Sequence, residues 1–122
     1  MKRVLDVGNC GLDHGNISSL IGRHFTADIF SADSADQALA LLRKQAFDLV
    51  LVNRKLDRDY SDGLDIIRQI KADEALAATP VMLLSNYAQY QDEAIEAGAE
   101  PGFGKSQLHQ PETVETLRRF LA

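Results

Sequence analysis

Three aspartates close together are the first residues whose types and spacing could do chemistry. Asp57, Asp59 and Asp62 place three carboxylates within one short segment, and carboxylate oxygens are the ligands that hard divalent cations prefer. The spacing lacks the full pattern of a calcium-binding loop, so a solvated turn is the favoured interpretation. The histidines show no spacing typical of metal ligands either; they are His14, His24 and His109.

A second group with chemical potential is a glycine-rich segment near the N-terminus. Gly8, Gly11 and Gly15 follow a short apolar run and precede a helical pattern, which is where phosphate-cradling loops occur. Their spacing fits neither of the two common nucleotide-binding glycine patterns, so nucleotide binding is disfavoured. Cys10 lies in the same segment and could react with oxidants, although a lone thiol is more often a bystander.

The overall composition limits the function classes. The chain has 122 residues, a formal net charge of −5, 45% hydrophobic and 25% charged residues, which suits one globular domain over residues 1–122. A nucleic-acid site would need a concentrated basic face, so we expect no nucleic-acid binding. The apolar runs are too short to span a membrane, and the single cysteine favours the reducing cytoplasm. We expect no cofactor.

Short apolar runs alternate with segments of helical period along the whole chain. The runs cover residues 4–7, 27–32, 49–52 and 81–84, and a weaker run surrounds Phe103. The segments between them carry apolar residues three and four positions apart, as on one face of a helix. This alternation predicts an α/β fold, namely a five-stranded parallel sheet of flavodoxin-like order 2-1-3-4-5 with five helices on both faces.

The carboxyl ends of the strands are where folds of this kind gather their chemistry. In this chain the predicted strands lead into residues 8–15, 53–62, 85–87 and 104–106. We therefore expect one site, built from loops that are far apart in the sequence.

These loops carry the pattern of a known family. Residues 4–9 and 47–53 match its first and third strands, residues 80–85 its fourth strand, and residues 98–105 the approach to its last polar position. Over essentially the whole chain, this layout resembles the CheY-like receiver domain of bacterial response regulators. The resemblance implies an acidic pair after the first strand, a phosphoacceptor aspartate after the third, a hydroxyl after the fourth and a lysine after the fifth. Ser85 and Lys105 retain the last two positions.

The departures from the family pattern concern the three carboxylates. Gly8 and Asn9 stand at the acidic-pair positions, and Asn53 stands at the phosphoacceptor position. By the resemblance, these carboxylates hold Mg²⁺ and one of them attacks phosphorus. The pattern therefore indicates a degenerate receiver, or pseudo-receiver, that takes up neither a metal ion nor a phosphoryl group. Three further positions also differ from the family: Asn86, Gly102 and Ser106.

Several roles stay open at the level of the sequence. Lys105 is expected to pair with a nearby aspartate, and the alternative is contact with Asn53 or with an anionic ligand. Arg54 and Lys55 either fill the position of the lost metal or are simply solvated. Asp6 interrupts a strand that should be buried, so it either meets Lys105 or Lys55 or lies in a polar environment.

The function that the resemblance implies is regulatory. We expect a phosphorylation-independent receiver that acts as a protein-interaction module in two-component or phosphorelay signal transduction. We do not expect an enzyme, because no nucleophile–base pair can be named. The partner is another protein or a second copy, bound through the fourth helix, the fifth strand and the fifth helix by Tyr87, Tyr90, Glu93, Glu96, Phe103 and Arg118. The alternative is a sensor whose Asn53, Ser85 and Lys105 hold a small anion or metabolite.

Overall fold

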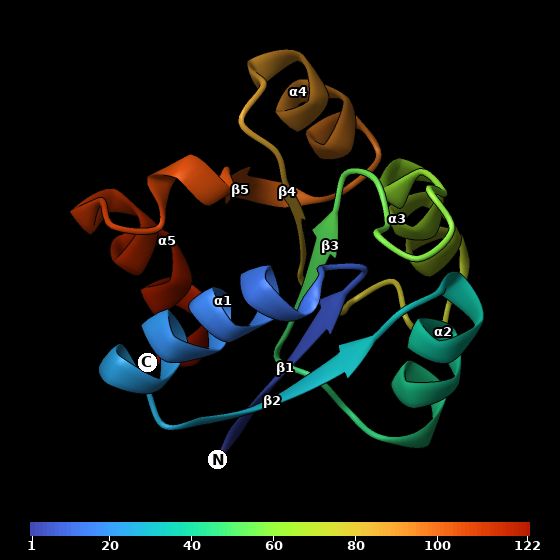
Figure 1. Cartoon of the computed structure of the whole chain (residues 1–122). Coiled ribbons are helices and arrows are strands. Elements are labelled where there is room, and N and C mark those ends of the chain that lie inside the picture. The colour runs from blue at the N-terminus through green and yellow to red at the C-terminus, as the bar shows by residue number, and fades with distance from the viewer.

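Five parallel strands form one sheet in the order β2-β1-β3-β4-β5, which confirms the predicted topology (Figure 1). The computed structural model describes residues 1–122. The strands are β1 (Lys2–Val7), β2 (Ala27–Ala32), β3 (Leu49–Asn53), β4 (Val81–Leu84) and β5 (Glu100–Phe103). The helices are α1 (Gly11–His24), α2 (Ala35–Lys44), α3 (Gly63–Ala72), α4 (Ala88–Glu96) and α5 (Pro111–Leu121), and a short 3₁₀ helix, η1 (Lys105–Gln107), precedes α5.

Local signals in the sequence set where several helices begin. The Ser34 hydroxyl accepts a hydrogen bond from the Gln37 amide (3.2 Å) at the start of α2. Asp62 accepts one from the Leu64 amide (2.9 Å) at the start of α3. Pro111 is the first residue of α5, where its fixed φ suits a helix and its missing N–H loses no bond. None of the helices is long and apolar enough to cross a membrane.

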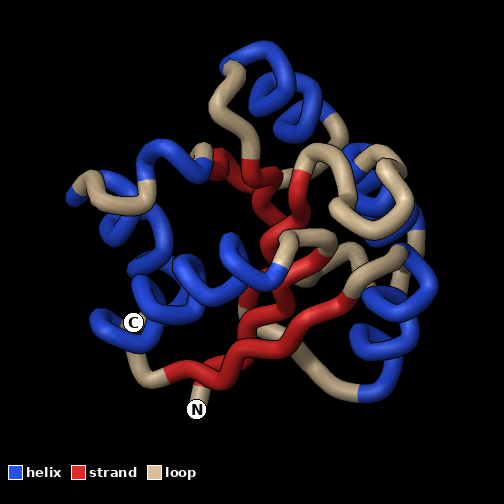
Figure 2. Tube along the Cα trace, in the orientation of Figure 1, coloured by secondary structure: helices blue, strands red, loops and turns tan.

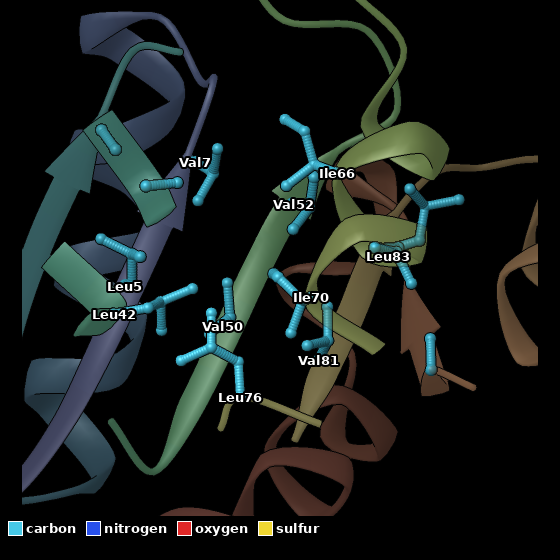
Figure 3. Close-up of a cluster of buried hydrophobic side chains, with 14 of the residues drawn as sticks. Leu5, Val7, Leu42, Val50, Val52, Ile66, Ile70, Leu76, Val81 and Leu83 are labelled. Carbon is cyan, nitrogen blue, oxygen red and sulfur yellow. The ribbon is translucent and has the colours of Figure 1, made fainter. Parts of the chain in front are cut away.

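Helices cover both faces of the sheet, and each face has its own hydrophobic core (Figures 1 and 2). Val50 and Val52 belong to the core under α2, α3 and α4, which Figure 3 shows in detail. Leu49 and Leu51, which alternate with them along β3, belong to the core under α1 and α5. Burial on both faces explains why the strands are continuous apolar runs rather than alternating ones.

The loop between β3 and α3 folds back against the end of β1. Leu56 in this loop is fully buried and belongs to the core under α2 and α3. The Asp57 amide donates to the Gly8 carbonyl oxygen (2.9 Å), and the Leu56 amide donates to the Ser61 carbonyl oxygen (2.9 Å). The loop therefore delivers an apolar side chain to the edge of the sheet where the site was expected.

Candidate functional site

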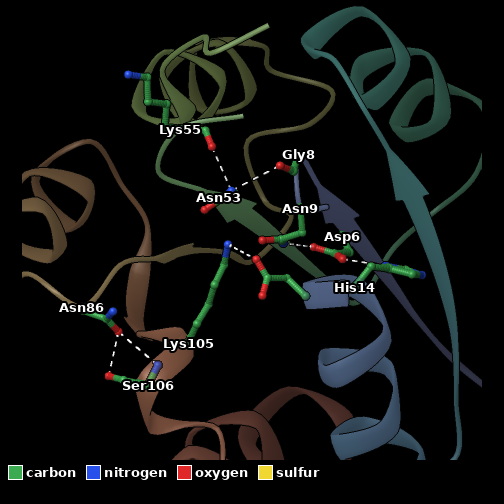
Figure 4. A network of polar contacts seen from close by, with 10 residues as sticks. Asp6, Gly8, Asn9, His14, Asn53, Lys55, Asn86, Lys105 and Ser106 are labelled. Atoms are coloured by element: carbon green, nitrogen blue, oxygen red, sulfur yellow. Dashed lines mark hydrogen bonds and ion pairs between the residues drawn. The ribbon is translucent and has the colours of Figure 1, made fainter. Parts of the chain in front are cut away.

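The loops that follow β1, β3, β4 and β5 meet at one edge of the sheet, as expected (Figure 4). A pocket of about 300 Å³ opens there. It is lined by Asn53, Arg54, Lys55, Leu84, Ser85, Asn86, Tyr87, Tyr90 and Lys105. The retained positions Ser85 and Lys105 and the degenerate position Asn53 thus lie together, whereas Gly8 and Asn9 line a separate pocket of about 270 Å³.

Asn53 ends β3, and its side-chain amide acts as a hydrogen-bond donor. Its Nδ2 donates to the Lys55 carbonyl oxygen at 2.8 Å and to the Gly8 carbonyl oxygen at 3.2 Å (Figure 4). Because both acceptors are backbone oxygens, the nitrogen end of the amide must face them. A carboxylate at this position has no hydrogen to donate and could make neither bond.

Gly8 follows β1 in a backbone conformation that favours glycine. Its φ is +81°, in the left-handed region that residues with a Cβ atom rarely adopt. A Cβ atom on Gly8 would lie 2.9 Å from Leu56 Cδ1 and 3.1 Å from Leu56 Cα. Leu56 therefore fills the space that a side chain at position 8 would need.

Asp6 lies within β1 and is only 1% exposed. The Asn9 side-chain amide donates to one of its oxygens, and His14 Nδ1 lies 2.6 Å from the other. Burial raises the pKa of Asp6, although its hydrogen bonds with His14 and Asn9 act in the opposite direction. The alternative in which Asp6 bonds Lys105 or Lys55 is not found, since its side-chain partners are Asn9 and His14. The polar environment that was the alternative is present, and it comes from the start of α1.

Lys105 forms an ion pair with Asp13, and the distance from Nζ to Oδ2 is 2.7 Å. This is the aspartate pairing that we expected, but the sequence did not identify the partner. Asp13 lies in the first turn of α1, within the segment 8–15 that was assigned to the site. The hydrogen bond from Lys105 lowers the pKa of Asp13. Because about 30% of each side chain is exposed, the pair contributes little stability.

Arg54 and Lys55 contact aromatic rings instead of replacing a metal ion. The Arg54 guanidinium lies over the Tyr90 ring, 4.1 Å from its centroid. The Lys55 ammonium lies over the Tyr60 ring at 5.4 Å, and its side chain points away from the network in Figure 4. Of the two alternatives left open by the sequence, replacement of the metal is therefore not found for either cation, and Lys55 is exposed, as in the other alternative. Arg54 Nε is buried and has no hydrogen-bond partner.

Two departures from the family pattern, Asn86 and Ser106, form one contact. Asn86 Oδ1 accepts from both the amide and the hydroxyl of Ser106, at 3.2 and 2.9 Å (Figure 4). Gly104 makes room for this contact, because a Cβ atom there would lie 2.8 Å from Asn86 Cα. Next to them, Ser85 Oγ accepts from the Tyr87 amide (3.2 Å) just before α4 begins. These bonds join the end of β4 to η1 and to α4.

A glutamine from α4 fills an irregularity between β4 and β5. The pairing register of these strands shifts between Met82 and Leu84. Gln91 Nε2 donates to the Leu83 carbonyl oxygen (2.8 Å), and the Gly102 amide donates to Gln91 Oε1 (3.0 Å). A Cβ atom on Gly102 would lie 3.2 Å from Gln91 Oε1, so the third departure also has a local partner.

The expected interaction surface on α4 and β5 needs one correction. Tyr87, directly before α4, is 66% exposed, and Glu93 and Glu96 are exposed on α4. Tyr90 is half-buried. Phe103, however, is 4% exposed and belongs to the core under α1 and α5. Phe103 is therefore a core residue and cannot contact a partner.

The two neighbouring arginines of α5 make different contacts. Arg118 lies over the Phe25 ring, 5.7 Å from its centroid, at the end of α1. Arg119 instead forms an ion pair with Glu100 of β5, with a distance of 3.7 Å. Arg119, and not Arg118, connects α5 to β5.

Comparisons with known proteins agree with this arrangement. A family model, the response regulator receiver domain, matches residues 13–117. The signal receiver domain of a DNA-binding response regulator from Colwellia psychrerythraea 34H is similar with a TM-score of 0.82 and 22% identity, over 98% of this chain and 97% of that chain. The chemotaxis protein CheY4 of Vibrio cholerae has a TM-score of 0.78 and 21% identity, over 99% of each chain.

A response regulator from Thermotoga maritima also has a TM-score of 0.78, with 21% identity over 98% of this chain and 97% of that chain. At these identities the structural neighbours show a shared fold, and the family match identifies its type. The matched segment begins after Gly8 and Asn9 and includes Asn53, Ser85 and Lys105. This chain belongs to the response regulator receiver domain family of two-component signalling.

Proposed function

We propose that this receiver domain accepts no phosphoryl group and acts as a phosphorylation-independent interaction module, a pseudo-receiver, in two-component or phosphorelay signalling. The observation that carries the proposal is the orientation of Asn53, whose amide donates to the carbonyl oxygens of Gly8 and Lys55. An amide is a far weaker nucleophile than a carboxylate. The Asn53 amide instead links the loop after β1 to the loop after β3. We propose no enzymatic activity, since no side chain that lines the pocket is a nucleophile hydrogen-bonded to a general base.

The residues at this edge do not fit a magnesium ion. Hard cations need several oxygen ligands, and carboxylates supply the compensating charge. No group of three or more His, Cys, Asp or Glu side chains is placed to hold a metal. Asn9 Oδ1 is a buried oxygen without a partner, but it is a single neutral acceptor. The carbonyl oxygens of Gly8 and Lys55, which converge on one point, already accept hydrogen bonds from Asn53.

The connection between the pocket and α4 supports a fixed binding surface. By family resemblance, a movable aromatic residue stands at position 102, whereas this chain has Gly102. Gln91 is hydrogen-bonded at both ends, to Leu83 on β4 and to Gly102 on β5. A side chain bonded in this way holds α4 in one position relative to the sheet.

We assign the partner contact to the surface of α4, β5 and α5. Tyr87 and Tyr90 pack edge to face with ring centroids 6.0 Å apart, so Tyr87 loses little freedom when it is buried by a partner. Tyrosine is also enriched among residues that dominate binding energy. Glu93 and Glu96 add exposed charge on α4. The proposed partner is another protein or a second copy of this chain, in the cytoplasm.

Intact-mass measurement tests the loss of phosphorylation. The protein is incubated with acetyl phosphate and Mg²⁺, in parallel with a receiver domain that has its acceptor aspartate. We expect an adduct on that control and none on this protein. The Asn53→Asp variant should also stay unmodified, because the acidic pair is still missing. A stoichiometric phosphoryl adduct on the unmodified protein would refute the proposal.

Light scattering during size-exclusion chromatography tests the surface for the case of a second copy. The Tyr87→Ala variant should lose self-association. The matched control is Tyr60→Ala, since Tyr60 is 72% exposed but lies in the loop between β3 and α3. A dimer that survives Tyr87→Ala and is lost in Tyr60→Ala would place the interface elsewhere.

A further inference from the structure

We infer that the pocket at the carboxyl ends of β3 and β4 binds a small oxyanion, noncovalently and without a metal ion. Three basic residues line the pocket, and no carboxylate does; they are Arg54, Lys55 and Lys105. The protein as a whole carries a formal charge of −5, whereas the charged residues that line this pocket are all positive. A concave site lined by one sign of charge concentrates ions of the opposite sign.

Arg54 is not neutralised within the protein, and Lys55, which is also unpaired, points away from the other pocket residues toward Tyr60. Lys105 is paired with Asp13 at 2.7 Å. Neither Arg54 nor Lys55 takes part in any of the ion pairs of the structure. Arg54 Nε is buried without a hydrogen-bond partner, and an unpaired buried donor of this kind is rare in native proteins. Because this atom is buried, an anion in the pocket would instead be bound by the terminal N–H groups of the guanidinium.

Arg54 is positioned before any ligand arrives. Its guanidinium lies 4.1 Å from the centroid of the Tyr90 ring, and Tyr90 in turn packs against Tyr87. A guanidinium held on an aromatic face loses little conformational entropy on binding. Its planar N–H groups match the paired oxygens of a phosphate or carboxylate.

Neutral donors complete the lining of the pocket. Ser85 Oγ accepts a hydrogen bond from the Tyr87 amide, which leaves its O–H free to donate. Asn86 uses its Oδ1 to bind Ser106, which leaves its Nδ2 group free. Both residues line the same pocket as the cations, so a bound oxyanion can receive hydrogen bonds from several directions.

The size and charge of the pocket define the class of ligand. Its volume of about 300 Å³ is at the small end of ligand sites and equals that of roughly ten water molecules. Arg54, the unneutralised cation held at the pocket, matches a small oxyanion such as hydrogen phosphate or a short dicarboxylate. This inference goes beyond the proposed function, which requires only that no covalent phosphoryl group forms. The mass measurement above can therefore succeed or fail independently of anion binding.

Thermal unfolding with added anions tests the inference. EDTA is present throughout to remove divalent metals, inorganic phosphate and succinate are the probes, and NaCl at equal ionic strength is the control. Phosphate or succinate at about ten times its dissociation constant should raise the Tm by roughly 5 °C above the value in NaCl. Equal Tm values in NaCl and in both probes would overturn the inference.

A pair of matched variants tests whether Arg54 holds the anion. Arg54→Gln should weaken binding at least tenfold, whereas Arg58→Gln should leave it unchanged. Arg58 is a suitable control because it lies outside this pocket and makes only an exposed ion pair with Asp33, at 4.0 Å. If Arg54→Gln lacks native circular dichroism, Ser85→Ala takes its place, since Ser85 lines the same pocket. Undiminished binding by the folded pocket variant would overturn the assignment.

Discussion

Gly8→Ala is the change whose cost follows most directly from the structure. Gly8 has a φ of +81°, and placing a residue with a Cβ atom in the left-handed region costs about 1–2 kcal/mol. The new Cβ atom would also lie 2.9 Å from Leu56 Cδ1 and 3.1 Å from Leu56 Cα. Overpacking of this kind costs about 1–3 kcal/mol more. We therefore expect the free energy of unfolding to fall by about 2–5 kcal/mol.

Urea unfolding followed by circular dichroism measures this change. Gly11→Ala is the matched control, because nothing lies within 4 Å of its Cβ position at the start of α1. It should be neutral or stabilising by about 0.5–1 kcal/mol. In the double variant Gly8→Ala/Leu56→Ala, the smaller side chain relieves the overlap. The loss should then be smaller than the sum of the two single changes. If Gly8→Ala unfolds at the same urea concentration as the wild type, Leu56 does not fill the space and the reasoning fails.

Three further changes test other parts of the molecule. Gln91→Leu leaves the buried Leu83 carbonyl oxygen on β4 and the partly buried Gly102 amide on β5 without these hydrogen bonds. The unfolding free energy should therefore fall by about 2–4 kcal/mol, and hydrogen exchange in α4 should accelerate. Asp6→Asn should be more stable than the wild type in urea at pH 8. Burial raises the pKa of Asp6 in the folded protein. The contribution of Asp6 to the unfolding free energy is therefore fully present below the ordinary pKa of aspartate, and it is lost as the pH rises through the raised pKa of the folded state. The difference in unfolding free energy between Asp6→Asn and the wild type should narrow toward pH 4. A difference that widens in acid would contradict the raised pKa of Asp6. Lys105→Met should cost less than about 1 kcal/mol at neutral pH, because the pair with Asp13 is partly exposed. That cost, measured by urea unfolding, should vanish as the pH falls through the lowered pKa of Asp13, and a cost that persists would argue against the pair.

The fold could be predicted because its signals are local. Continuous apolar runs indicate strands buried on both faces, and their alternation with helical stripes leaves few topologies. The site could be located for the same reason, since parallel strands bring their carboxyl ends to one edge. Asn53, Ser85 and Lys105 accordingly line one pocket.

The sequence did not predict the orientation of side chains whose direction is set by tertiary packing. Phe103 ends a strand of four residues, which is too short for the sequence to show which face it meets. Arg118 and Arg119 are neighbours on α5, so a rotation of about 100° decides which one reaches β5. Asp13 and His14 were missed because their partners on η1 and β1 are set by how α1 lies on the sheet.

The departures from the receiver pattern depend on one another. Because Gly8 has no side chain, Leu56 can be buried beside it, and the Asn53 amide then binds the Gly8 carbonyl oxygen. Replacing Asn53 by aspartate removes this donor and sets a carboxylate against the two carbonyl oxygens that it served. Replacing Gly8 by aspartate carries the same backbone and packing cost as alanine. An acidic site at this edge therefore needs a different course of the loop that carries Leu56, in addition to new carboxylates.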